Sequence, residues 1–137
     1  MKNLSNSLKR TLVLDPDVYT SSSTSSSIVT QGFSSNQMVI IVGQSGDSLS
    51  SSVHWDFKLQ DSDSSSSGFS DVSSSNLFEN SSTVTVDSSS DDEKSYSFNY
   101  RGSKRYLRVN ASATGTHTNG TPYAILAIQS HAGNQPV

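Results

Sequence analysis

The sequence predicts an all-β fold, an antiparallel β-sandwich of jelly-roll type with an extended N-terminal arm. Three observations predict it. Apolar residues gather in short runs, several of these runs alternate with period 2, and segments rich in serine, glycine and aspartate separate them. No stretch of useful length shows the 3.6-residue period of a helix. Roughly seven or eight strands result, which is typical of a sandwich.

The composition sets limits on this fold. The chain has 137 residues, which suits one domain, and only 31% of them are hydrophobic, while roughly a quarter are serine. Such a composition is typical of disorder, but the net charge is only -3 and the apolar residues are clustered, which favours a folded chain. Nine Lys and Arg against 12 Asp and Glu predict no nucleic-acid partner. No run approaches the roughly 20 apolar residues of a membrane helix, so no membrane partner is expected.

Residues 1–20 are predicted to form a reaching arm. The Ser/Thr run 21–27 follows as a flexible link with nothing to pack. Apolar residues on a tethered arm are stabilised only when a partner covers them, because ordering the arm costs entropy. We therefore expect interface residues here, namely Leu12, Leu14, Val18 and Tyr19.

The sandwich domain is predicted over residues 28–131. Its first long strand, MVIIVG (38–43), is apolar throughout and predicts cover on both faces. The segment SVHWDFKLQD (52–61) alternates cleanly, and SSTVTVDS (81–88) alternates again. In a strand, alternate side chains point to the same face. The pattern in 52–61 therefore predicts that one face is buried in the core, namely the face that carries Val53, Trp55, Phe57 and Leu59.

The stretch YRGSKRYLRV (100–109) predicts a hairpin. Gly102 followed by Ser103 fits a type II′ turn, and alternation places Leu107 and Val109 opposite Tyr106 and Arg108. Aromatic and arginine side chains are enriched at interfaces, so Tyr106 and Arg108 are predicted interface residues.

The last strand, PYAILAIQ (122–129), is apolar on both faces, which predicts cover by the other sheet and by a neighbouring copy. It adds Tyr123 to the predicted interface. Residues 132–137 are predicted to form a C-terminal tail.

Candidate chemical sites are weak. The loop DSDSSSSG (61–68) has the first ligand spacing of an EF-hand but lacks its glycine and its glutamate, so a solvated turn is favoured over a weak cation site. The acidic run 91–93 is predicted to be a solvated loop, and His54, His117 and His131 are predicted at the surface without zinc-ligand spacing. No G-x-S-x-G elbow is present. We expect no catalytic residue, no cofactor and no metal.

The order of the segments MKNLSNSLK, MVIIVG, HWDFKLQDSD, FSDV, YRGSKRYLRV and SHAGNQPV resembles the small structural proteins of tailed bacteriophages. The resemblance implies a capsid decoration (cement) or virion accessory protein on the capsid exterior. The implied partners are the major capsid protein and the chain itself, as a homotrimer.

Two alternatives remain open. One is a receptor- or carbohydrate-binding module, for which Trp55 and Tyr106 are candidate aromatic residues. The other is a tail or connector component. The orientation of Trp55 discriminates the first alternative from a scaffold, because an inward Trp55 serves packing and an outward one serves sugar binding.

Overall fold

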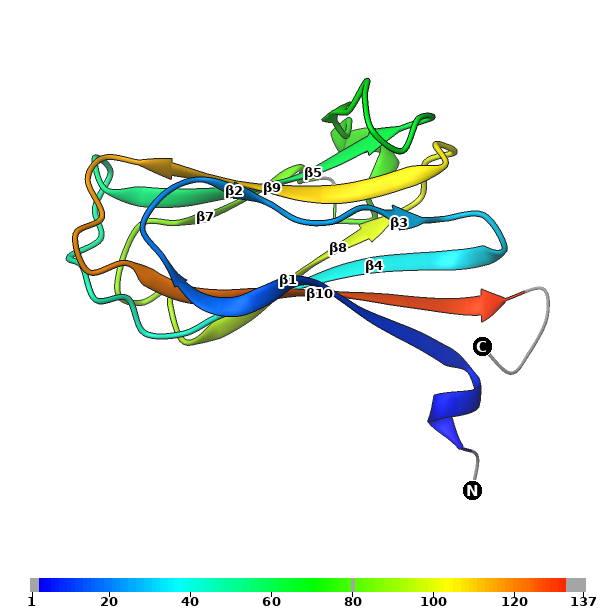
Figure 1. Ribbon diagram of the computed structural model, residues 1–137, viewed down its shortest axis with the longest axis horizontal. Coiled ribbons are helices and arrows are strands. Elements are labelled where there is room, and N and C mark those ends of the chain that lie inside the picture. The colour runs from blue at the N-terminus through cyan, green and yellow to red at the C-terminus, as the bar shows by residue number, and fades with distance from the viewer. Residues whose placement is uncertain (1–2, 80, 133–137) are drawn as a thin grey trace.

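The computed structural model describes residues 3–79 and 81–132, and it is a β-sandwich (Figure 1). Two short 3₁₀ turns, η1 (Leu4–Asn6) and η2 (Ser74–Asn76), accompany the strands. The strands are β1 (Leu8–Tyr19), β2 (Ser23–Thr24), β3 (Ile28–Val29), β4 (Phe33–Val42), β5 (His54–Ser62), β6 (Ser70–Asp71), β7 (Thr83–Val86), β8 (Lys94–Tyr100), β9 (Tyr106–Thr114) and β10 (Thr121–Ala132). Among the residues described, no helix is long and apolar enough to span a membrane.

The strands form two antiparallel sheets. The first sheet has the order β1-β10-β4-β8. In the second sheet, β9 and β5 are the two central strands. The short strands β2 and β3 pair with the free edge of β9, and the short strands β6 and β7 pair with the free edge of β5. Along the chain, β1, β4, β8 and β10 belong to the first sheet, and the strands between them belong to the second. This repeated crossing between sheets is the jelly-roll arrangement, so the predicted fold class is confirmed.

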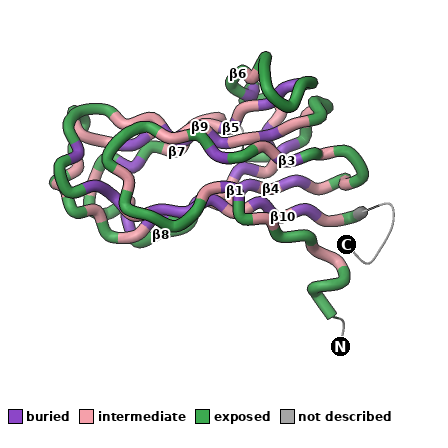
Figure 2. Tube along the Cα trace, viewed as in Figure 1, coloured by how far each residue is buried: buried purple, intermediate pink, exposed green. Residues whose placement is uncertain are grey.

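The core lies between the two sheets, where the period-2 side chains of both sheets meet. Figure 2 shows buried residues along the strands of both layers. The predicted core residues Trp55, Phe57 and Leu59 are fully buried, and Val53 is half-buried just before β5. Met38, Ile40 and Phe98 face them from the first sheet. The alternation in 52–61 therefore predicted the correct face.

The predicted arm 1–20 is wrong, because most of it is a strand of the sandwich. β1 pairs with β10 from Leu8 opposite Ser130 to Tyr19 opposite Thr121, with irregular register in between. Val13 lies at the first irregularity and is buried in the core. The backbone of β1 thus finds its hydrogen-bond partners within the chain. Among the described residues of the predicted arm, η1 lies outside the sheets, at the N-terminal end in Figure 1.

The predicted flexible link 21–27 is also wrong, because its serine hydroxyls pair with the backbone of β9. The Ser25 hydroxyl accepts from the Val109 N–H at 2.9 Å, and the Ser22 hydroxyl accepts from the Ala113 N–H at 2.9 Å. Ser25 itself is buried. A serine hydroxyl can accept a hydrogen bond from a backbone N–H in place of a carbonyl oxygen. The serine run is therefore ordered against β9. The predicted tail 132–137 starts at the last residue of β10 and otherwise lies outside the described residues.

The predicted hairpin at Gly102-Ser103 is a corner between the two sheets. β8 pairs with β4 in the first sheet, and β9 pairs with β5 in the second. The Tyr100 hydroxyl anchors the corner, since it donates to Asp61 at 2.8 Å and accepts from the Lys104 N–H at 3.0 Å. The pKa of Tyr100 lies well above its usual value, mainly because the side chain is buried and also because its hydroxyl donates to Asp61.

Candidate interaction surface

The outer face of the first sheet carries apolar side chains that the chain itself does not cover. The register places Leu12 beside Leu126, Leu126 beside Val39, and Ala124 beside Ile41. Leu12 is 51% exposed and Ile41 is 49% exposed. We name this surface the apolar face; its members are Leu12, Val39, Ile41, Leu126 and Ile128, together with Ala124, which is only 9% exposed. Adjacent exposed apolar residues on one sheet are the usual mark of a binding surface.

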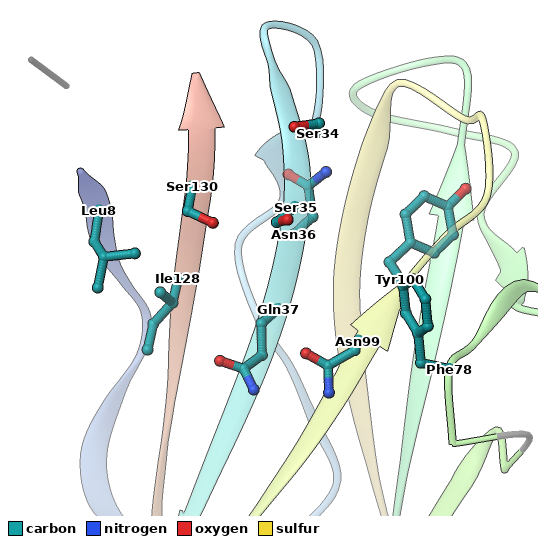
Figure 3. Close-up of a pocket in the computed structure, with 10 residues that line it drawn as sticks. All are labelled: Leu8, Ser34, Ser35, Asn36, Gln37, Phe78, Asn99, Tyr100, Ile128 and Ser130. Atoms are coloured by element: carbon teal, nitrogen blue, oxygen red, sulfur yellow. The ribbon is translucent and has the colours of Figure 1, made fainter. Parts of the chain in front are cut away.

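A row of side chains crosses the same sheet next to the apolar face. The register aligns Arg10, Ile128, Gln37 and Asn99, and the Phe78 N–H donates to the Asn99 carbonyl at 3.0 Å. Figure 3 shows Ile128, Gln37 and Asn99 on three neighbouring strands, with Phe78 beyond Asn99. Phe78 is 64% exposed. The row therefore begins with a cation and ends with an exposed aromatic ring.

Glu79 adds a negative charge at the aromatic end of this row. Its two carboxylate oxygens accept from the backbone N–H and the side-chain amide of Asn99, both at 2.8 Å. Within the described residues neither Glu79 nor Arg10 takes part in an ion pair. The two ends of the row thus carry opposite charges, and at the aromatic end the Arg101 guanidinium also lies 5.5 Å from the Phe78 ring centroid.

A shallow groove of about 490 Å³ lies along this part of the sheet. Its lining is Leu8, Ser34, Ser35, Asn36, Gln37, Phe78, Asn99, Tyr100, Ile128 and Ser130 (Figure 3). These side chains are aliphatic, aromatic, hydroxyl and amide groups, and none of them is a carboxylate, imidazole or amine. This lining offers apolar contact and hydrogen bonding.

The structure separates the predicted interface residues of the N-terminal segment. Leu12 and Val18 are exposed, as predicted, and Leu12 belongs to the apolar face. Leu14 and Tyr19 instead pack against the core, because the irregular register of β1 turns them inward. The Tyr19 ring stacks on Tyr123 with 4.3 Å between ring centroids.

Tyr106 and Arg108 lie on the outer face of the second sheet, on the opposite side of the sandwich. The Arg108 Nε donates to Gln60 at 2.9 Å, and its guanidinium lies 4.1 Å from the Phe69 ring centroid. These intramolecular contacts already occupy the Arg108 side chain. The outer face of β9 predicted from alternation is correct, and its role as an interface stays a prediction.

Tyr123 is a core residue, and its predicted interface role is wrong. It is only 2% exposed, its hydroxyl hydrogen-bonds with Ser23 at 2.8 Å, and its ring meets Trp55 and Phe57 edge-on at 5.0 Å. The inner face of β10 is covered by the second sheet, while its outer face belongs to the apolar face. Trp55 points inward, donates to Thr121 at 3.1 Å and is fully buried. This orientation favours a scaffold over sugar binding by Trp55.

The acidic turn 61–68 uses its carboxylates within the chain. Asp61 accepts from Tyr100, and Asp63 pairs with the Lys104 ammonium at 2.9 Å. In the part of the chain that the structure describes, no three His, Cys, Asp or Glu side chains gather as a metal site. Asp92, in the acidic run 91–93, is buried and accepts from the Ser45 N–H at 3.0 Å, so that loop is only partly solvated.

His117 is buried, contrary to its predicted place at the surface. It is 4% exposed, packs 4.8 Å from the Trp55 ring centroid, and places its Nδ1 3.8 Å from Asp47. Asp47 also accepts from the backbone N–H groups of Asn119 and Gly120. The Asn119 hydrogen bond is the main reason that the pKa of Asp47 lies below its usual value. This cluster holds the β9–β10 loop closed and has the character of structural support.

The sequence pattern does not predict the surface positions of Arg10, Phe78, Glu79, Val39 and Ile41. Alternation within 38–43 was hidden, because every residue of that run before the glycine is apolar. The hydrogen bond between Phe78 and Asn99 joins residues that are distant in the sequence, so no local sequence pattern predicts it.

Among solved structures, one protein shares the fold of this chain. The crystal structure of the PBSX exported protein XepA matches with a TM-score of 0.52 and 15% identity, over 100% of this chain and 41% of XepA. The chain therefore spans less than half the length of XepA. The SPBc2 prophage-derived protein YomS matches with a TM-score of 0.46 and 14% identity, over 89% of this chain and 93% of YomS.

A third structure is the CBM22-1-GH10 part of the Clostridium thermocellum xylanase Xyn10B, with a TM-score of 0.43 and 11% identity, over 75% of this chain and 17% of that one. No protein-family model and no curated protein matches the chain. The similarity to XepA shows a shared fold.

Proposed function

We propose that the protein is a non-enzymatic structural component of a phage virion that decorates the capsid exterior. In this role it binds the major capsid protein and stabilises the shell by bridging capsid subunits. The resemblance of its segments to small phage proteins supports the proposal, and so does a jelly-roll fold shared with XepA.

The apolar face is the observation that carries this proposal. The exposure of Leu12 and Ile41 costs free energy in the free protein, because water disfavours contact with apolar surface. These two residues lie beside further apolar side chains, namely Leu126 and Val39. Such a face is suited to assembly. The adjoining groove contributes hydroxyl and amide groups for hydrogen bonds.

Particle binding by face variants tests the proposal. Ile41→Asp introduces a charge into the apolar face, and we expect at least a tenfold loss of occupancy on purified particles, measured by cryo-electron microscopy. Val29→Asp is the matched control, because Val29 is β-branched, 43% exposed and located on β3 of the second sheet. Full occupancy by Ile41→Asp contradicts the role of the apolar face. Copies seen in a ring at the tail vertex contradict the capsid role in favour of a tail or connector component.

A further inference from the structure

We propose that a second copy of this chain docks on the apolar face, about a two-fold axis that runs parallel to the strands between β10 and β4. The inference rests on the proposed function in one respect, namely that the apolar face is an assembly surface. It adds the identity of the occupant and the geometry of the contact.

A two-fold axis along the strands exchanges the two edges of the first sheet. In the sheet order β1-β10-β4-β8, it places β1 of one copy opposite β8 of the other, and β10 opposite β4. Two-fold contacts are self-complementary, so each residue pair occurs twice. Sheets that pack face to face keep their strands within about 30° of each other, which suits this orientation.

The charges of the row complement each other under this operation. Arg10 stands at the β1 end of the row, and Phe78 and Glu79 stand at the β8 end. The axis therefore brings Arg10 of each copy over Asn99 of the other, whose side-chain amide donates to the Glu79 carboxylate at 2.8 Å. A guanidinium pairs strongly with a carboxylate, and this contact gains strength when water is excluded.

The side chains along the axis also match in size. Leu126 of one copy meets Val39 of the other, so two aliphatic side chains pack against each other. The exposed Ile41 meets Ala124, which is small and leaves room for a larger side chain. Alternation of large and small side chains lets two faces interdigitate.

The area fits a weak and reversible dimer. Four strands about 4.8 Å apart, paired over about seven residues of about 3.3 Å each, give a face of about 19 by 23 Å. Two such faces bury on the order of 900 Å² in flat projection, near the lower limit of about 1,000 Å² for a specific interface. We therefore expect a dimer weak enough to dissociate on dilution, which sedimentation equilibrium over a range of chain concentrations measures.

The orientation also explains how a dimer bridges a shell. Because the axis runs along the strands, the same loops of both copies point in the same direction. Two identical loop surfaces can then bind two neighbouring capsid subunits, and the linked contacts reinforce each other by effective concentration.

A charge exchange tests the geometry. Arg10→Glu and Glu79→Arg should each weaken the dimer at least tenfold in sedimentation equilibrium, because each places like charges together. The double variant should return to within about threefold of the original constant, since it restores opposite charges across the interface. Asp71→Arg is the control for Glu79→Arg, as it makes the same change of charge on an exposed residue of β6. Failure of the double variant to restore the dimer overturns the proposal.

Thiol cross-linking tests the axis independently of the charges. The chain has no cysteine, so an equal mixture of Leu12→Cys chains and Ser97→Cys chains carries one thiol per chain. Leu12 and Ser97 lie at one level of the register on the two edge strands, so the two-fold axis places Leu12 of one copy opposite Ser97 of the other. A short bismaleimide that spans the roughly 10 Å between facing sheets should therefore link the two variants to each other and leave each variant alone largely unlinked. Equal linking in all three combinations, or no linked dimer, overturns the proposal.

The same measurements separate this inference from the proposed function. A dimer that forms as predicted and leaves particles undecorated supports the inference and contradicts the function. The opposite result is a chain that stays monomeric at 1 mM and still decorates particles, with the decoration lost in the Ile41→Asp variant. This result contradicts the inference and supports the function.

Discussion

Replacing Gly102 by alanine is predicted to destabilise the corner between the two sheets. A Cβ atom at Gly102 would lie 2.5 Å from Cζ and 2.7 Å from Cε1 of Tyr100, so the ring or the backbone has to move. If the ring stays, overpacking costs about 1–3 kcal/mol. If the ring moves, the buried Asp61 loses a hydrogen bond, and bonds to charged groups contribute about 1.5–3 kcal/mol.

Either response lowers the free energy of unfolding by about 1.5 kcal/mol, after a gain of about 0.4–1 kcal/mol from the stiffer unfolded chain. For a chain of this length, that corresponds to a fall in Tm of about 4–8 °C. Thermal unfolding followed by circular dichroism measures it, with Ser103→Ala as the control at the neighbouring position. In a Tyr100→Ala background the ring is absent, so Gly102→Ala should cost less than about 0.5 kcal/mol. An unchanged Tm for Gly102→Ala alone refutes the steric argument.

Three further predictions concern the fold. Trp55→Ala should lower the free energy of unfolding by about 3–5 kcal/mol in urea titration, and a shift near zero contradicts its place in the core. Deletion of residues 1–20 removes β1, so we expect loss of cooperative thermal unfolding, whereas a free arm would leave the Tm unchanged. Burial raises the pKa of Tyr100 and Tyr123, so the folded chain holds protons that the unfolded chain loses above about pH 10. Stability should therefore be full below that pH and fall above it, by up to about 1.4 kcal/mol per pH unit for each tyrosine, and replacement of both by phenylalanine should flatten the alkaline limb.

The sequence by itself determined which side of each strand faces the core. Alternation fixed Trp55, Phe57 and Leu59 as inward and Tyr106 and Arg108 as outward, because successive side chains of a strand point to opposite faces whatever the strand pairs with. It also indicated a sandwich, since the number and spacing of short strands depend only on the chain itself.

Only the tertiary structure decided which strands pair. Alternation is the same in a hairpin and across a sheet corner, so the stretch around Gly102 was assigned to the wrong connection. The pairing of β1 with β10 depends on contacts more than 100 residues apart, and the ordering of Ser22 and Ser25 depends on N–H groups of β9. The apolar face has the same origin. Leu12, Ile41 and Leu126 become neighbours only when three distant strands align, because a sheet brings residues together by register and not by distance along the chain.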